Sequence, residues 1–343
     1  MEALVIHAPG DLRVEDVPTP ALQAGQLRVR VRCGGICGSD LHYYQHGGFG
    51  TVRIAEPMVL GHEVAGVIEA AADGVPFTSG ERVAISPSRP CGRCRYCQEG
   101  LQNHCLDMRY YGSAMRTPHV QGAFRQQIVV EHWQAQRLAD SVSDAEGAMA
   151  EPLSVALHAV RRAGSLLGKR VLVTGCGPIG ALAIIAARRA GAVQIVATDV
   201  GAHTLGKALA VGADEVVNVA ESPDGLARFT ADKGHFDVLF EASGNERALR
   251  GAFDALRPRG VIVQVGLGGE VTLPLNTIVA KEFDLRGAFR FHEEFAVAVE
   301  LLNKGLVDVK PLISATLSYR DSARAFALAA DRSQAMKVIL DFE

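Results

Sequence analysis

Four of the seven cysteines lie in one short segment, and their spacing is typical of a metal site. The segment reads Cys91-x2-Cys94-x2-Cys97-x7-Cys105. In a chain whose N-terminus does not read as a secretion signal, such a cluster indicates metal binding rather than disulfide bonds. Four thiolates leave no open position on Zn²⁺, so the pattern predicts a structural zinc ion. An iron–sulfur cluster also takes four cysteines, but nothing else in the sequence indicates electron transfer.

A second set of candidate metal ligands is spread along the chain. Cys37 lies in GGICGSDLH, which we expect to form a glycine-flanked loop, His62 and Glu63 lie in VLGHEVAG, and Glu151 opens EPLSVALHAV. A catalytic zinc takes a few N, S or O ligands and keeps one position open, a need that Cys37, His62 and one of the two glutamates meet. Each residue also has an ordinary structural reading, since either glutamate can form a salt bridge. Asp40 is a candidate acceptor for the second ring nitrogen of His62, or a turn cap.

A glycine-rich segment predicts a dinucleotide site. Gly175-Cys176-Gly177-Pro178-Ile179-Gly180 follows the apolar run VLVT and opens a helix-like stretch. In that context Gly175 permits a tight turn, Gly177 lets the backbone approach a pyrophosphate, and Gly180 allows close packing of helix on strand. The N-terminus of the helix then faces the phosphates.

Two further segments are expected to contact the cofactor. Asp199 ends the next predicted strand, 19 residues after Gly180. A carboxylate there accepts hydrogen bonds from ribose hydroxyls and repels a 2′-phosphate, which favours NAD over NADP, although Asp199 can also simply cap the next helix. Val265, Gly266 and Leu267 lie at the end of the fifth predicted strand and are expected at the nicotinamide, where an ordinary turn is nearly as good an explanation.

These residues need two kinds of scaffold, and the hydrophobic patterns predict both. The first 140 or so residues read as mostly β, with β-branched runs at 26–33, 57–70, 81–85 and 123–130. A helix-like stretch follows at 144–164. Short apolar runs then alternate with helix-like segments, at 171–174, 194–198, 215–219, 236–242, 260–266 and 283–289. The fold class is therefore α/β, with a doubly wound, parallel, six-stranded Rossmann sheet beside a mostly β catalytic domain.

The domain boundaries follow from the same patterns. We expect a zinc-binding catalytic domain at 1–146, an NAD-binding domain at 147–286, and a C-terminal segment at 287–343 that returns to the first domain. That last segment contains a predicted helix at 293–304 and a final apolar run.

Composition excludes several classes of protein. Hydrophobic residues make up 48% and charged residues 21% of the 343 residues, which is typical of globular domains. Lys and Arg number 35 against 38 Asp and Glu, without a basic stripe, so nucleic-acid binding is not expected. No apolar run approaches the roughly 18 residues of a transmembrane helix. We expect a soluble cytoplasmic protein with a small-molecule substrate and no membrane partner.

The motifs, taken in order, resemble a known family. CGSDxH, GHExxG, the four-cysteine segment, EPL and GxGxxG are similar to the zinc-containing medium-chain alcohol and polyol dehydrogenases, and the resemblance covers essentially the whole chain. Glu151 stands where alcohol dehydrogenases usually have a second cysteine. In having a glutamate at this position, the chain resembles the sorbitol dehydrogenase branch. The segments ICGSDLHYYQHG, PMVLGHEVAG and PCGRCRYC resemble the enzymes of this branch that oxidise L-idonate.

The resemblance implies a GroES-like catalytic domain and a role for each metal-site residue. Cys37, His62 and Glu63 would bind the catalytic zinc, and Glu151 would either ligate it or hold a water beside it. Ser39 would take the substrate proton.

The resemblance also implies the rest of the proton relay and the substrate pocket. His42 would continue the relay to solvent through the cofactor ribose, and Tyr43, Glu151 and Arg290 would line the substrate pocket. The sorbitol enzymes tend to carry Tyr after that Arg, whereas this chain has Phe291, which weakens a sorbitol assignment.

The implied reaction is NAD-dependent oxidation of a secondary alcohol, with one catalytic and one structural zinc per subunit of a homotetramer or homodimer. L-idonate, oxidised to 5-keto-D-gluconate, is the first expected substrate, and sorbitol or xylitol the alternative. The carboxylate of a sugar acid needs a cationic partner, for which the candidates are Arg290, Arg53, Arg109, Arg116 and His46. A non-catalytic dinucleotide-binding protein of the same fold is a remote alternative, because the ligands and the relay are all present.

Overall fold

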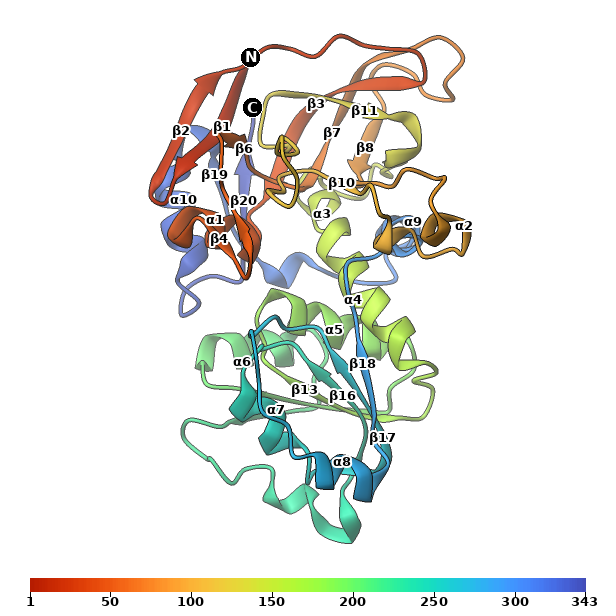
Figure 1. The fold of residues 1–343 in the computed structure, drawn as a ribbon, viewed down its shortest axis with the longest axis vertical. Helices are drawn as coiled ribbons and strands as arrows, with labels where there is room; N and C mark the ends of the chain where they lie inside the picture. Colours follow the sequence, from red (N-terminus) through yellow and green to blue (C-terminus); the bar gives the residue numbers. More distant parts are fainter.

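The computed structural model describes residues 1–343 and shows two lobes (Figure 1). The lower lobe in that view contains a parallel six-stranded sheet in the order β15-β14-β13-β16-β17-β18. Its strands are β13 (Arg170–Thr174), β14 (Gln194–Asp199), β15 (Glu215–Asn218), β16 (Phe236–Glu241), β17 (Leu256–Gln264) and β18 (Asp284–Gly287). This is the doubly wound sheet that the sequence predicts, and each strand falls within a residue or two of an expected run, except that β17 begins earlier and β18 ends earlier.

Helices cover both faces of this sheet because successive strand residues point to opposite sides. Val171 and Val173 pack in the core shared with α4, α5 and α9, whereas Leu172 packs in the core shared with α7. The helices of this lobe and its border are α4 (Ala150–Ala163), α5 (Pro178–Arg189), α6 (Ala202–Ala210), α7 (Glu246–Ala252), α8 (Leu275–Lys281) and α9 (Glu294–Asn303). Helix α9 confirms the helix expected at 293–304.

The upper lobe is built on a seven-stranded sheet in the order β12-β8-β7-β3-β20-β19, with β11 also paired to β3. Its strands are β3 (Gln26–Gly35), β7 (Glu63–Ala71), β8 (Arg82–Ile85), β11 (Gln127–Glu131), β12 (Ala135–Arg137), β19 (Ile313–Ser318) and β20 (Lys337–Asp341). The C-terminal strand β20 pairs antiparallel with β3, so the end of the chain returns to the first lobe, where Figure 1 shows both termini.

Smaller elements complete the upper lobe. A three-stranded sheet contains β1 (Glu2–Ala8), β2 (Asp11–Asp16) and β6 (Met58–Val59). Two short hairpin-like pairs are β4 (Gly48–Phe49) with β5 (Val52–Arg53) and β9 (Ser88–Arg89) with β10 (Arg109–Tyr110). The remaining helices are α1 (Gly38–His46), α2 (Arg95–Gln98), α3 (Asp144–Ala148) and α10 (Ser322–Ala330). No helix combines the length and the apolar character that crossing a membrane requires.

The helix-like stretch at 144–164 is divided into two helices. Ser143 caps α3, and its hydroxyl accepts a hydrogen bond from the amide of Glu146. The chain then restarts at Ala150, which places Pro152 in the first turn of α4. A proline lacks the amide hydrogen that a helix interior needs but is tolerated in the first turn, so the division follows from Pro152.

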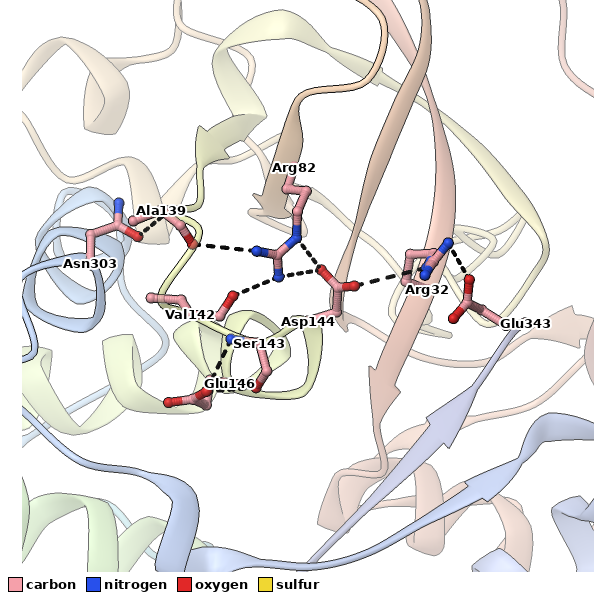
Figure 2. A network of polar contacts seen from close by, with 9 residues as sticks. All are labelled: Arg32, Arg82, Ala139, Val142, Ser143, Asp144, Glu146, Asn303 and Glu343. Carbon is pink, nitrogen blue, oxygen red and sulfur yellow. Dashed lines mark hydrogen bonds and ion pairs between the residues drawn. The ribbon is translucent and has the colours of Figure 1, made fainter.

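A network of polar contacts fixes the connection between the lobes. Figure 2 shows the guanidinium of Arg82, on β8, donating to the carbonyl of Val142 at 2.6 Å and to the carboxylate of Asp144 at 2.8 Å. Arg32 lies on the other side of Asp144, at 3.8 Å. These contacts hold the start of α3, and with it the entry to α4, against the sheet of the upper lobe.

Candidate active site

Cys37 lies in the short connection after β3, as predicted, but the rest of the segment, expected to be loop as well, forms helix α1. The reason is Asp40, whose carboxylate accepts a hydrogen bond from the Cys37 amide at 3.0 Å and caps the helix. The same carboxylate accepts a hydrogen bond from the Gly61 amide at 3.2 Å and lies 3.9 Å from Nδ1 of His62. Asp40 therefore holds the start of α1 against the loop that carries His62.

Three potential metal ligands converge at this point. The Sγ of Cys37, a ring nitrogen of His62 and a carboxylate oxygen of Glu63 all lie within 4.8 Å of one another. The two carboxylate oxygens of Glu63 accept hydrogen bonds from the amine of Lys337 at 2.6 and 2.8 Å. Lys337 begins β20, so the last strand of the chain completes a site that the first lobe begins.

The electrostatics of this cluster suit a divalent cation. Asp40, Glu63 and Glu151 are buried acidic groups, more than the single buried amine beside them can offset. Burial opposes protonation of His62, but Asp40 and Cys37 outweigh burial and raise the pKa of His62 well above its usual value. Sulfur, imidazole and carboxylate donors are a set that Zn²⁺ accepts with one position left open. The residues present therefore fit a catalytic zinc.

Glu151 lies beside the three clustered ligands but is not one of them. It is the second residue of α4, where the positive end of the helix favours a carboxylate. The hydroxyl of Tyr110 donates a hydrogen bond to Oε1 of Glu151. Burial raises the pKa of Glu151 to about 7, against the lowering effect of His62. Sequence reasoning assigned no role to Tyr110, because its segment carries no ligand or nucleotide motif and only the fold places it here.

The two residues expected to move a proton lie on α1. Ser39 is half-buried, and His42 is exposed three residues further along the same face of the helix. Burial and the neighbouring His46 lower the pKa of His42. A lowered pKa keeps the ring neutral near pH 7, and a neutral imidazole can accept a proton.

A cavity of about 370 Å³ lies next to this cluster, with Tyr110, Met115, Arg116 and Arg290 in its lining. Its volume is in the range of pockets for small molecules. Tyr43, expected in the pocket lining, is 1% exposed and is not among the lining residues. Its hydroxyl accepts a hydrogen bond from the Ala114 amide at 3.0 Å, so Tyr43 supports the wall from behind.

Arg290 is the cation of this cavity that has no acidic partner. Its guanidinium lies 4.1 Å from the ring centre of Tyr110 and contacts the sulfur of Met115 at 3.2 Å. Its φ of 54° places a non-glycine residue in the left-handed region, at a cost of roughly 1 kcal/mol or more. Arg116 also lines the cavity, but it forms an ion pair with Asp107 at 2.6 Å.

The four cysteines of the expected structural site lie together. Their sulfur atoms are all within 4.8 Å of one another. The amides of Cys97 and Leu106 stabilise the thiolate of Cys94 and lower its pKa to about 6. Because four convergent sulfurs form the tetrahedral ligand set of structural zinc, the donor set fits that ion as well.

The segment that carries these four cysteines also forms part of the cavity wall. Cys105 and Leu106 line the cavity, and the side-chain amide of Asn103 donates to the carbonyl of Phe289 at 3.0 Å. His104 stacks on the ring of Phe289 at 6.1 Å between centroids. The cysteine segment therefore fixes the position of the residues around Arg290.

The glycine-rich loop at β13 has the shape that a pyrophosphate requires. Gly175 has a φ of 86°, and a Cβ there would come within 2.6 Å of the Ser243 amide nitrogen. A Cβ on Gly180 would come within 1.8 Å of the Gly175 carbonyl oxygen. Gly177 is the N-cap of α5, and the position of its Cβ is open space, as expected where a ligand approaches the helix N-terminus. Pro178 and Ile179 form the first turn of α5.

Asp199 holds the same loop in place. One carboxylate oxygen accepts from the Cys176 amide at 2.6 Å, and the other accepts from the amides of Val200 and Gly201 at 2.7 and 2.9 Å. The amides of Val200 and Gly201 precede α6, whose N-cap is Gly201 and has no side-chain cap hydrogen bond, so Asp199 does not cap that helix. Its half-buried carboxylate instead links the end of β14 to the glycine-rich loop.

The segment after β17 lies against the turn that follows β16. The amides of Val265 and Gly266 donate to the carbonyl of Glu241 at 2.8 and 2.9 Å. A Cβ on Gly266 would come within 2.2 Å of the Gly244 amide nitrogen, and Leu267 is 82% exposed beyond it. The backbone is therefore tightly packed at this edge of the sheet, and Leu267 is left free to meet a ligand.

Comparison with known proteins places this arrangement in a family. Residues 23–140 match the alcohol dehydrogenase GroES-like domain, and residues 178–304 match the zinc-binding dehydrogenase domain. The chain is 45% identical to L-idonate 5-dehydrogenase (NAD(P)(+)) of Escherichia coli over 92% of this chain and 91% of that protein. It is 37% identical to human sorbitol dehydrogenase, covering 94% and 91% of the two chains.

Solved structures agree with the sequence comparison. The crystal structure of L-idonate 5-dehydrogenase from Escherichia coli superposes with a TM-score of 0.95 at 42% identity, covering 99% of this chain and 97% of that one. Both lobes and the order of their motifs are shared with these dehydrogenases. The chain therefore belongs to the zinc-binding alcohol and polyol dehydrogenases with a GroES-like catalytic domain.

Proposed function

We propose that this enzyme oxidises L-idonate to 5-keto-D-gluconate with NAD as the acceptor. The observation that carries this choice of substrate is the 45% identity to the Escherichia coli L-idonate enzyme over 92% of this chain. Arg290, a guanidinium in the cavity wall without an acidic partner, supplies the cation that the carboxylate of a sugar acid needs, and a guanidinium and a carboxylate match in geometry. The sorbitol enzymes tend to carry an arginine at this position as well, so Arg290 does not separate the two substrate classes.

The catalytic zinc would be held by Cys37, His62 and Glu63, with Glu151 beside them. When bound, Zn²⁺ supplies Lewis acidity that makes the substrate hydroxyl easier to deprotonate. The residues of this chain then divide the work. Ser39 takes the hydroxyl proton, and the exposed His42 passes it to solvent.

When bound, NAD would supply the acceptor for the hydride that leaves the substrate carbon. The alcohol becomes a ketone, and one proton is released for each NAD reduced. The open cradle at Gly177 suits the pyrophosphate. We infer a preference for NAD over NADP because a carboxylate at Asp199 repels a 2′-phosphate. The second zinc would be held by Cys91, Cys94, Cys97 and Cys105 and would stabilise the wall of the cavity.

A polyol such as sorbitol or xylitol is the second candidate substrate, supported by the identity to sorbitol dehydrogenases. Phe291 argues against it, because it offers no hydroxyl to a neutral polyol. A panel of L-idonate, D-gluconate, sorbitol, xylitol and L-threonine, followed by the absorbance of reduced nicotinamide, tests the assignment. We expect the highest kcat/KM for L-idonate, and a higher value for any neutral polyol would refute it.

The enzyme also offers a surface for self-association. Strand β18 is the edge of the nucleotide-binding sheet, and its own Leu285 is 44% exposed. Leu275 and Val279, on the preceding helix α8, are 67% and 75% exposed. Exposed apolar side chains beside an unpaired strand edge support a homodimer or homotetramer. Sedimentation of the purified protein tests the oligomeric state.

Seven unpaired cysteines, most of them proposed metal ligands, support a reducing compartment such as the cytoplasm.

A further inference from the structure

Tyr110 contacts both Glu151, beside the proposed metal ligands, and Arg290, in the wall of the cavity. Its hydroxyl donates to Glu151, and its ring face lies 4.1 Å from the guanidinium of Arg290. Its ring centre is 5.8 Å from that of His62 and 6.5 Å from that of Phe291. Tyr110 is 8% exposed and belongs to the cavity lining.

The hydroxyl fixes where Glu151 lies. A carboxylate beside a metal site can either join the ligand set or stay outside it. The ligand atoms of Cys37, His62 and Glu63 form the cluster without Glu151, whose Oε1 is occupied by the Tyr110 hydroxyl. The two glutamates of the site are therefore held by different partners, Glu63 by Lys337 and Glu151 by Tyr110.

The ring fixes where Arg290 lies. Arg290 has no ion-pair partner, and its contacts are with the Tyr110 and Phe289 rings and with the sulfur of Met115. A flat aromatic face holds a guanidinium by cation–π attraction while leaving its N–H groups free to bind an anion. Phe291, the next residue in the chain, is 1% exposed and is not among the lining residues, so the aromatic ring of the cavity lining that contacts Arg290 is that of Tyr110.

We propose that Tyr110 is a positioning residue that sets both the ligand role of Glu151 and the orientation of the carboxylate-binding Arg290. The hydroxyl keeps Glu151 out of the metal's ligand set, which preserves an open position for the substrate. The ring presents Arg290 to an anionic substrate. This second role rests on the proposed function, and the first does not.

The test compares Tyr110→Phe, which removes only the hydroxyl, with Tyr110→Leu, which removes the ring as well. Tyr111→Phe is the matched control, because Tyr111 is equally buried and its hydroxyl donates to Gln134 at 3.2 Å, away from the site. Zinc retention is measured by competition with a chromogenic chelator, and kcat and KM are measured for L-idonate and xylitol.

Tyr110→Phe is expected to lower kcat about 10- to 100-fold, the usual effect of changing a residue that surrounds a metal site without ligating it, because the freed Glu151 can take the position that the substrate needs. Because the freed Glu151 can join the ligand set, the catalytic zinc should be held at least as firmly as in the wild type. In a Glu151→Ala background the same substitution should change kcat less than about threefold, since coupled residues are non-additive. Full kcat in Tyr110→Phe, weaker zinc binding, or an additive effect would overturn the role of the hydroxyl.

Tyr110→Leu is expected to raise KM for L-idonate about tenfold further, the size of a partly buried cation–π contact, while KM for xylitol changes little. Equal changes for both substrates would overturn the role of the ring. If the wild type fails to oxidise L-idonate, the proposed function fails. The role of the hydroxyl is then still decided by two measurements. One is the competition for zinc with the chelator, and the other is the effect of Tyr110→Phe on kcat in the Glu151→Ala background, measured with whichever alcohol the enzyme oxidises.

Discussion

Replacing Lys337 by methionine removes the only cation that is bonded to Glu63. The side chains of Lys337 and Glu63 are 2% and 1% exposed. The amine makes three hydrogen bonds, two to Glu63 and one to the Ile36 carbonyl, all within 3.1 Å. Methionine keeps most of the volume of the lysine stem, so the substitution tests charge and hydrogen bonding rather than packing.

The magnitude follows from burial. Breaking a fully buried ion pair by removing one partner costs about 3–5 kcal/mol, because the other charge is left uncompensated. In a protein of this size that corresponds to a fall in Tm on the order of 5–10 °C. Bound zinc is a second cation close to Glu63, so it should offset part of the loss. We therefore expect a large deficit in the chelator-treated protein and a smaller one in the zinc-loaded protein.

The assay is thermal unfolding of wild type and Lys337→Met, each with zinc and after chelation. Lys281→Met is the matched control, because the Lys281 amine also makes three contacts, at 3.0, 3.1 and 2.7 Å, but all are to backbone carbonyls far from the metal site. Its deficit should not depend on zinc. Combining Lys337→Met with Glu63→Gln should recover much of the lost stability. Equal deficits with and without zinc, or no deficit at all, would refute the reasoning.

Three further predictions follow from other contacts. Cys97→Ser should release one zinc per subunit and lower the Tm while the second zinc stays bound, as measured by metal analysis and thermal unfolding; full stability would contradict the structural site. Asp199→Ala should reduce the ratio of kcat/KM for NAD over NADP, and an unchanged ratio would exclude a ribose role. Burial would raise the pKa of Glu294, but hydrogen bonds from His158 and nearby amides outweigh it and lower it to about 2. The stability from this carboxylate is therefore present above its ordinary pKa of 4.5 and is lost as the pH falls towards 2. Glu294→Gln should lower the Tm at pH 7, and the gap to wild type should narrow over that range; a constant gap would refute the sign.

Local sequence patterns were sufficient for much of the fold. Each strand of the nucleotide-binding sheet is a short apolar run, and the glycine pattern at 175–180 specifies its own turn and helix start, so both are readable within about ten residues. The loop expected around Cys37 is only two residues long, also for a local reason, because Asp40 caps helix α1 directly after it. The sequence indicates Asp40 as a turn cap or a partner of His62, and no helix is expected there. The domain boundaries at 146/147 and 286/287 remain predictions from the sequence.

The sequence by itself determined which chemical groups this protein carries: four sulfurs spaced for one metal, a dispersed set of ligands for another, and a dinucleotide loop. The tertiary structure alone decided how the dispersed groups meet. Lys337 and Glu63 are 274 residues apart in the chain, Arg290 and Met115 are 175 apart, and Tyr110 and Glu151 are 41 apart. No local pattern encodes such contacts, because they form only when β20 pairs with β3 and α4 is fixed between the lobes. The physical reason is that a buried charge needs a partner in space, and the partner's position in the chain is immaterial.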